Sequence, residues 1–189
     1  MARAGRAACY ALLGRAAESA SDYEEALRLF PEQTDWRFEW GKALFGAKRF
    51  QEAEEAFSDV LKADPQRTEA MVWRGESRFA QGRYGEAARD YIEALRERPV
   101  EGGLWRRLGV ALLEGGMSSE AREALEKAAE LEPKDPAGWT ALGMACEATG
   151  DDAAAFRAYR RAMELAPGYA PAQQGEKRVV DRAQKEVAK

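Results

Sequence analysis

The side chains that most often carry out chemistry in proteins are scarce in this sequence. The chain contains no His and no Asn, which removes the commonest general base near neutral pH and the commonest metal ligand. It also lacks a Gly-rich phosphate loop, a His-based dyad and a metal-spaced Cys cluster. Carboxylates are plentiful, but charged residues on helices usually form a solvated face. We therefore predict that the protein is not an enzyme and has no catalytic residue, no metal ligand and no cofactor.

The pattern of charged and apolar residues bears on partners and compartment. The 33 acidic and 29 basic residues are interspersed along the chain, whereas nucleic-acid-binding proteins usually concentrate Lys and Arg on one face. No run of about 18 apolar residues occurs. We therefore predict no nucleic-acid partner and no membrane insertion. Residues 1–14 combine a basic flank with a short apolar stretch; this indicates either a weak signal peptide or, as we prefer, the first helix of a repeat. The predicted location is the cytoplasm, with the periplasm as the alternative.

A repeat with a period of 34 residues predicts the helices that must position any functional site. Four series of equivalent residues share this spacing, which chance does not explain. They are the prolines Pro31, Pro65, Pro99, Pro133 and Pro167; the glycines Gly41, Gly75, Gly109 and Gly143; the alanines Ala53, Ala87, Ala121 and Ala155; and the large residues Tyr23, Phe57, Tyr91, Leu125 and Tyr159. Each period predicts two helices, for example over residues 35–47 and 51–63. Small residues at paired places let the two helices approach closely, and a left-handed glycine such as Gly82 ends the first helix.

The periodic residues resemble the pattern of the tetratricopeptide repeat family, W-x2-L-G-x2-Y…A-x3-F…P. The fourth repeat has Trp105, Leu108 and Gly109 at the first three of these places. The resemblance implies an all-α fold, a right-handed superhelical α-solenoid of stacked antiparallel helix pairs. It places five repeats at residues 1–33, 34–67, 68–101, 102–135 and 136–169. Residues 170–189 then form a C-terminal capping helix with an apolar stripe of Val179, Val180, Ala183 and Val187; a docking helix for a partner is the alternative.

Arginines stand at places where the pattern expects apolar or aromatic side chains. In the first repeat these are Arg3 and Arg6, which indicate a frayed or solvated first helix or a shortened chain. In the third repeat Arg74 and Arg78 occur. They either extend to solvent or pair with acids such as Glu76 or Asp90, or else the helix is rotated to present its aromatic residues to a ligand.

The two cysteines are predicted to be unpaired. Cys9 and Cys146 lie four repeats apart, so an elongated array keeps them beyond the reach of a disulfide. Both are expected on inner helix faces, as small buried apolar residues.

The resemblance also implies a binding surface, because the first helix of each pair lines the concave face in this family. We expect aromatic and acidic character in the first half of this groove and an arginine pair in the middle. An exposed Trp among Phe residues is typical of a protein-binding hot spot. The alternative is that the Phe residues pack between adjacent helices. The candidate partner-binding residues are Phe38, Glu39, Lys42, Phe45, Val72, Trp73, Glu76, Phe79, Arg106, Arg107, Val110, Leu113, Thr140, Met144 and Glu147.

Two functions remain at this stage. The first is a non-catalytic adaptor that binds a peptide or protein partner in the groove. The second is a self-associating assembly scaffold, or a chaperone-like subunit of a larger complex, since open array ends expose apolar helix faces and permit a homo-oligomer. Family members that clamp the C-terminal carboxylate of heat-shock chaperones use Lys and Asn. Only Lys42 matches in kind here, so that activity is not expected.

Overall fold

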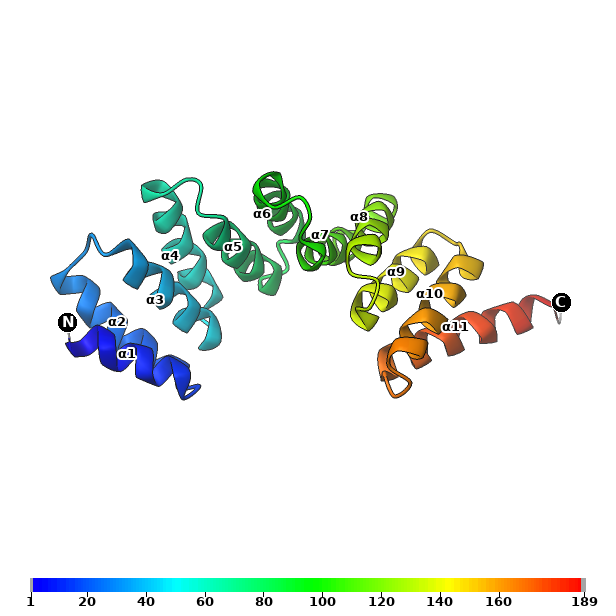
Figure 1. Cartoon of the computed structure of the whole chain (residues 1–189), viewed down its shortest axis with the longest axis horizontal. Helices are drawn as coiled ribbons and strands as arrows, with labels where there is room; N and C mark the ends of the chain where they lie inside the picture. The colour runs from blue at the N-terminus through cyan, green and yellow to red at the C-terminus, as the bar shows by residue number, and fades with distance from the viewer. Residues whose placement is uncertain (1, 188–189) are drawn as a thin grey trace. The chain divides into compact units, whose positions relative to one another are not determined.

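All regular structure in residues 2–187, the part of the chain that the computed structural model describes, is α-helical (Figure 1). This confirms the predicted all-α fold. No helix in this part is long and apolar enough to cross a membrane. The helices are α1 Ala2–Leu12, α2 Ala16–Leu29, α3 Thr34–Gly46, α4 Phe50–Ala63, α5 Thr68–Ala80, α6 Tyr84–Glu97, α7 Gly102–Glu114, α8 Ser118–Leu131, α9 Pro136–Ala148, α10 Asp152–Leu165 and α11 Ala170–Val187.

The helices keep the 34-residue period of the sequence. The A helices, which are the odd-numbered ones, begin from α3 onward at Thr34, Thr68, Gly102, Pro136 and Ala170. The even-numbered B helices follow the same interval. The chain divides into two compact units, Met1–Glu97 and Arg98–Lys189. Within each unit, helices that are consecutive in the chain pack against each other, so that A and B helices alternate. The N-terminal unit holds α1–α6 and the C-terminal unit holds α7–α11.

Left-handed turn residues end the A helices, as the sequence predicts. Gly14, Gly82, Gly116 and Gly150 have φ between 71° and 79°. In the second repeat Lys48 takes this place with φ 61°, a conformation that costs a residue with a side chain about 1–2 kcal/mol.

The repeat glycines face a large side chain of the following B helix. A Cβ atom built on Gly41 would lie 2.8 Å from the ring of Phe57, and one on Gly143 would lie 2.6 Å from the ring of Tyr159. These rings are fully buried. The glycine therefore makes room for the aromatic core of its own repeat.

A second recurring contact ties the starts of α3, α7, α9 and α11 to the preceding loop. A side-chain N–H donates a hydrogen bond to the carbonyl oxygen of the repeat proline, at 2.7–3.0 Å. The donors differ in type but are related by multiples of 34 residues. The pairs are Arg37 with Pro31, Trp105 with Pro99, Trp139 with Pro133 and Gln173 with Pro167.

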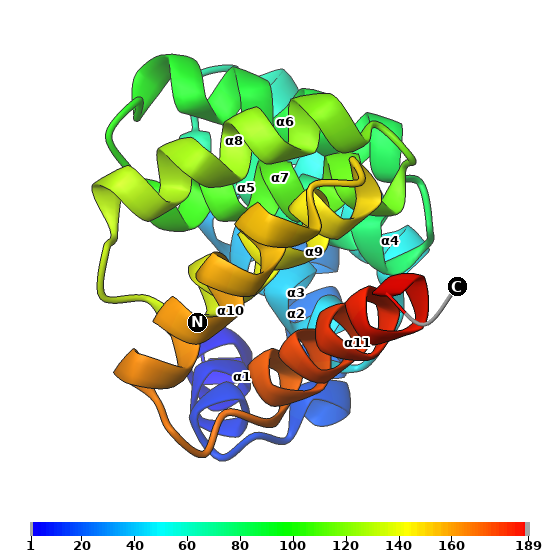
Figure 2. The ribbon, with the colours of Figure 1, turned by 90° about the vertical axis from the view of Figure 1, so that its right-hand side faces the viewer.

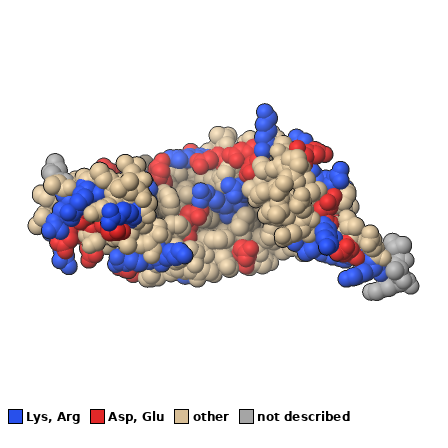
Figure 3. Space-filling model, turned by 90° about the horizontal axis from the view of Figure 1, so that it is seen from below, with Lys and Arg blue, Asp and Glu red and all other residues tan. Residues whose placement is uncertain are grey.

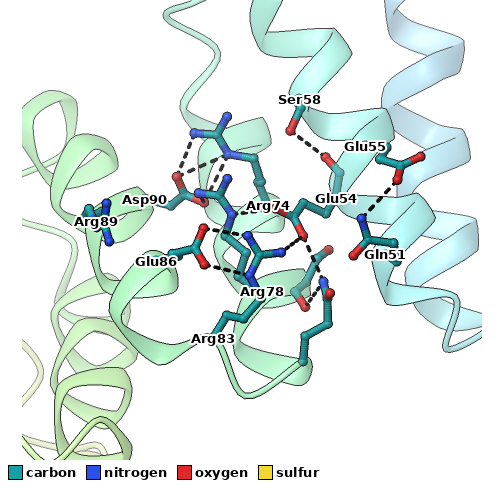
Figure 4. A network of polar contacts seen from close by, with 12 residues as sticks. Gln51, Glu54, Glu55, Ser58, Arg74, Arg78, Arg83, Glu86, Arg89 and Asp90 are labelled. Atoms are coloured by element: carbon teal, nitrogen blue, oxygen red, sulfur yellow. Dashed lines mark hydrogen bonds and ion pairs between the residues drawn. The ribbon is translucent and has the colours of Figure 1, made fainter.

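The arginines of the third repeat are paired rather than extended to solvent (Figure 4). Arg74 contacts both carboxylate oxygens of Asp90 on α6, with its Nη2 at 2.7 Å from Oδ1. Arg78 donates to Asp90 at 2.9 Å and to Glu54 of α4 at 2.9 Å. The proposed pairing with Asp90 is thus confirmed, whereas Glu76 instead accepts a hydrogen bond from Tyr91. The network joins the second and third repeats.

The first repeat contains an equivalent pair of arginine and aspartate. Arg6 lies 68 residues before Arg74, and it forms two hydrogen bonds with Asp22, which lies 68 residues before Asp90. The Arg6 side chain is 58% exposed. The first helix is therefore solvated on one side and held by ion pairs on the other. Cys9 on this helix is exposed, so the expectation of an inner position was wrong for Cys9, while Cys146 is buried as expected.

The last helix, α11, takes the place of a sixth A helix in the C-terminal unit, beside α10 and α9 (Figure 2). Val179 is buried and Val180 half-buried, but Ala183 is exposed, so the predicted apolar stripe is shorter than expected. The side chain of Val187 lies outside the described residues. Lys177 stands 34 residues after Gly143 and is exposed, which makes the outer face of α11 polar, as a cap requires.

Candidate functional site

A hollow in the described residues lies within the N-terminal unit, beside α1 and α3. Its volume is about 660 Å³, within the range of about 300–1,000 Å³ that is common for ligand sites. We call it the α1–α3 hollow. Its lining residues are Ala8, Ala11, Leu12, Gly14, Ala16, Tyr23, Glu39, Lys42, Ala43, Gly46 and Trp73.

The hollow exists because α1 carries small side chains where later A helices carry large ones. Ala8 is equivalent by the period to Lys42 of α3, and Ala11 is equivalent to Phe45. Both alanines are exposed, and Leu12 beside them is 90% exposed. The substitution of alanine at these two places removes the bulk that would otherwise fill the space between α1 and α3.

The residue that α5 contributes to the hollow is aromatic. The Trp73 ring of α5 stacks on Phe57 with centroids 6.2 Å apart and an interplanar angle of 20°. It meets Phe45 edge-on at 5.3 Å. These contacts fix the orientation of the Trp73 ring. Because Trp73 is only half-buried, part of the indole stays open to the hollow. A fixed, partly exposed Trp provides contact area with little entropy loss on binding.

The polar groups of the hollow carry no net charge. Lys42 donates to both oxygens of Glu39, at 2.9 and 3.1 Å, and also lies over the Phe38 ring at 5.6 Å. Burial raises the pKa of the Tyr23 hydroxyl, and the nearby charge of Glu39 raises it further. Tyr23 is therefore a protonated hydrogen-bond donor at neutral pH.

Four of the predicted residues share one repeat position, and the structure does not place them outward. Phe38 is 7% exposed and Thr140 is 4% exposed, while Val72 and Arg106 are half-buried. The physical reason is the residue just before the next A helix, which covers this position. The Arg67 guanidinium lies 4.3 Å from the centroid of the Phe38 ring, and Asp135 lies 3.0 Å from Arg106.

Phe38 thus follows the alternative that Phe residues pack between helices. Its ring meets Phe57 at 5.7 Å. Phe45 and Phe79 are half-buried, and each packs edge-on against the first residues of the following B helix, Phe50 and Tyr84. Of the predicted residues in the N-terminal unit, the hollow brings together Glu39, Lys42 and Trp73. Glu76 instead contacts Tyr91, its hydrogen-bond partner.

In the C-terminal unit, three of the predicted residues, Leu113, Met144 and Glu147, line a smaller hollow of about 390 Å³. It is lined by Leu113, Glu114, Met144, Glu147, Ala148 and Arg178. Glu147 accepts hydrogen bonds from Arg178 and Arg182 of α11 and from Tyr159. Burial alone would raise the pKa of Glu147, but these partners outweigh it and hold the pKa below its ordinary value.

Glu147 is therefore committed to holding the last helix. Of the remaining predicted residues in this unit, Arg107 is exposed and Val110 half-buried. The Thr140 hydroxyl donates to the Pro136 carbonyl at 2.8 Å.

Lys and Arg side chains lie close to Asp and Glu side chains on the face seen in Figure 3. Among residues 2–187, no group of three potential metal ligands is present.

The hollow contains residues that the sequence analysis did not name, among them Ala8, Ala11 and Tyr23. The signal was in the sequence, because placing the first repeat over the second sets Ala8 and Ala11 against Lys42 and Phe45. A place where one repeat has a much smaller side chain than its neighbours predicts a gap in the stack.

Sequence models of the tetratricopeptide repeat family match the chain at residues 8–68 and 38–102, at 78–145 and at 136–169. No curated protein sequence matches the chain significantly. Solved structures do match it in fold. A fragment of MamA from Desulfovibrio magneticus RS-1, residue 41 to the end, has a TM-score of 0.83 at 21% identity, over 88% of this chain and 94% of that chain.

Two further structures are similar. A double mutant titled MamA RS-1 ArsTM has a TM-score of 0.81 at 22% identity and covers 85% of this chain and 90% of its own. TTC0263, a thermophilic repeat protein of the same type from Thermus thermophilus, has a TM-score of 0.68 at 18% identity, over 94% of this chain and 97% of that one. At these identities the likeness concerns the fold alone.

Proposed function

Because the chain belongs to the tetratricopeptide repeat family, whose members in general are scaffolds for protein–protein interaction, we propose that it holds a partner through the α1–α3 hollow. The bound element is a peptide segment of the partner. Proteins of this family are typically non-catalytic interaction modules. The observation that carries the proposal is an open volume of about 660 Å³ with a fixed aromatic wall at Trp73.

The hollow fits a peptide better than a charged small molecule. Its walls are mainly apolar side chains, including Ala8, Ala11 and Leu12. The charge of Lys42 is already neutralised by Glu39. An apolar side chain of a ligand would gain about 25 cal/mol for each Å² that it removes from water here, and Trp73 would be the centre of the contact.

The test is a selection of displayed random peptides against the full chain, followed by titration of the recovered peptides. Ala11→Phe fills the hollow with the residue that α3 carries at the equivalent place. Since Ala11 is exposed, the fold is expected to survive, which circular dichroism checks. Ala63→Phe is the matched control, because Ala63 is an exposed residue at the end of α4, away from the lining residues.

We expect Ala11→Phe and Trp73→Ala to weaken peptide binding about 10- to 30-fold, the range of a hot-spot residue, and Ala63→Phe to leave it unchanged. Peptides that bind all three variants as well as the parent chain would refute the site. A selection that recovers no peptide would refute the proposed function.

A further inference from the structure

Three repeats carry a tyrosine at the same place, and one of the three differs in its hydrogen bonding. Tyr91 donates its hydroxyl proton to Glu76 at 2.9 Å. Tyr159 donates its own to Glu147. Tyr23 is 4% exposed and lines the α1–α3 hollow, yet within residues 2–187 its hydroxyl has no hydrogen-bond acceptor.

The reason lies in the two alanines that create the hollow. Glu76 is equivalent by the period to Ala8, and Glu147 is equivalent to Ala11. The first repeat therefore lacks both carboxylates that serve as acceptors in the third and fifth repeats. The same two substitutions open a space and leave a donor facing it. Because Tyr23 lines the hollow, a ligand bound there can supply the acceptor that the first repeat lacks.

We propose that Tyr23 is the polar anchor of a peptide subsite in the α1–α3 hollow, where its hydroxyl donates to a backbone carbonyl oxygen of the ligand and the hollow takes that residue's aliphatic side chain. This inference rests on the proposed function and specifies its ligand. The bound residue is apolar because Ala8, Ala11 and Leu12 surround the space.

A neutral acceptor fits the subsite better than a carboxylate. Glu39 lines the same hollow as Tyr23, and its charge raises the pKa of the Tyr23 hydroxyl, which therefore stays a donor. Glu39 and Lys42 neutralise each other, so the hollow offers a carboxylate no net positive charge to replace the water that it would lose on binding. A backbone carbonyl carries no charge and is present in every peptide residue.

The first experiment uses N-acetyl-leucine methylamide as the probe. It has one apolar side chain and neutral carbonyl groups on both sides. The amide signals of Gly14 and Gly46, which line the hollow, report its binding by NMR. We expect a dissociation constant on the order of 1 mM for a ligand of this size. N-acetyl-leucine, which ends in a carboxylate, should bind more weakly.

The decisive variant is Tyr23→Phe, which removes only the hydroxyl. We expect it to weaken binding of the amide about two- to tenfold, the effect of one neutral hydrogen bond. Tyr91→Phe and Tyr159→Phe are matched controls and should not change the affinity, because their hydroxyls are used inside the fold. In the absence of ligand the expectation is the opposite. Tyr23→Phe should not lower the unfolding midpoint, whereas each control should lower it by removing the hydrogen bond that Tyr91 or Tyr159 donates to a glutamate.

Several outcomes overturn the inference: no shift of the two glycine signals, equal affinity in Tyr23→Phe, or tighter binding of the carboxylate probe. Its failure can be told apart from failure of the proposed function. If selected peptides bind the parent chain and lose affinity in Ala11→Phe but not in Tyr23→Phe, the anchor is wrong and the peptide site remains. If no peptide is selected, the proposed function fails whatever the small probe does.

Discussion

The ion pair between Arg74 and Asp90 should be replaceable, as a pair, by apolar residues that this chain already uses elsewhere. The fourth repeat has Leu108 and Ala124 at the equivalent places, and both are buried there. Arg74→Leu combined with Asp90→Ala transfers this pair into the third repeat. Each single substitution, by contrast, removes one member of the ion pair and keeps the other, charged member between the packed helices.

The structure sets the expected magnitudes. Asp90 is 3% and Arg74 23% exposed at the side chain. Loss of one partner of a buried pair costs about 3–5 kcal/mol. Because Arg78 still has Glu54 at 2.9 Å, we expect about 3 kcal/mol for Asp90→Ala. Arg74→Leu should cost about 1–3 kcal/mol, since Arg78 stays beside Asp90. The double variant should cost at least about 1.5 kcal/mol less than the sum of the two.

A local assay measures this effect most directly, because each repeat of such an array contacts only its neighbours. Hydrogen exchange of the backbone amides in α5 and α6 gives the opening free energy of this region. Asp59→Ala is the control, since Asp59 forms a surface ion pair with Lys62 and should change little. Additive effects of Arg74→Leu and Asp90→Ala would show that the two side chains are not coupled, and the network would then have no role in stacking.

Three further outcomes follow from particular residues. Lys48→Gly should raise the urea midpoint, with a gain of about 0.5–1 kcal/mol from relief of its left-handed backbone; no gain would mean that the turn is unstrained. Gly109→Leu should lower the melting temperature, because its side chain collides with Leu125, at a cost of about 1–3 kcal/mol. Burial alone would raise the pKa of Glu54, but hydrogen bonds from Arg78 and other partners outweigh it, so the folded-state pKa is below the unfolded one. The stability it contributes is present above the unfolded pKa and should be lost as the pH falls below about 5, and Glu54→Gln should flatten that part of the urea-midpoint profile against pH.

The sequence predicted the helices well because their signals are local and repeated. The predicted helix over residues 35–47 is α3, Thr34–Gly46, and the positive φ at Gly82 follows from a turn that only glycine adopts without strain. It failed where the answer depends on how one helix is rotated against the next. Phe38 and Thr140 were assigned to the surface by alignment alone, and neighbouring segments bury them.

The candidate site was harder to predict because it depends on small side chains at places where other repeats carry large ones. Candidate residues were sought among large and charged side chains, whereas the hollow depends on Ala8 and Ala11. The role of Tyr23 becomes visible only when its hydroxyl is compared with those of Tyr91 and Tyr159, whose partners come from A helices. Such a comparison needs side-chain positions.

The contact of α3, α7, α9 and α11 with the preceding proline carbonyl bears on how such repeats diverge. The indole of Trp105, the guanidinium of Arg37 and the carboxamide of Gln173 each donate this hydrogen bond. The contact needs only an N–H group at the right reach, so side chains that differ in size and charge can form it. An N–H donor at this place can therefore mark a repeat that has lost the signature tryptophan, although the third repeat carries Met71 there and folds without this contact.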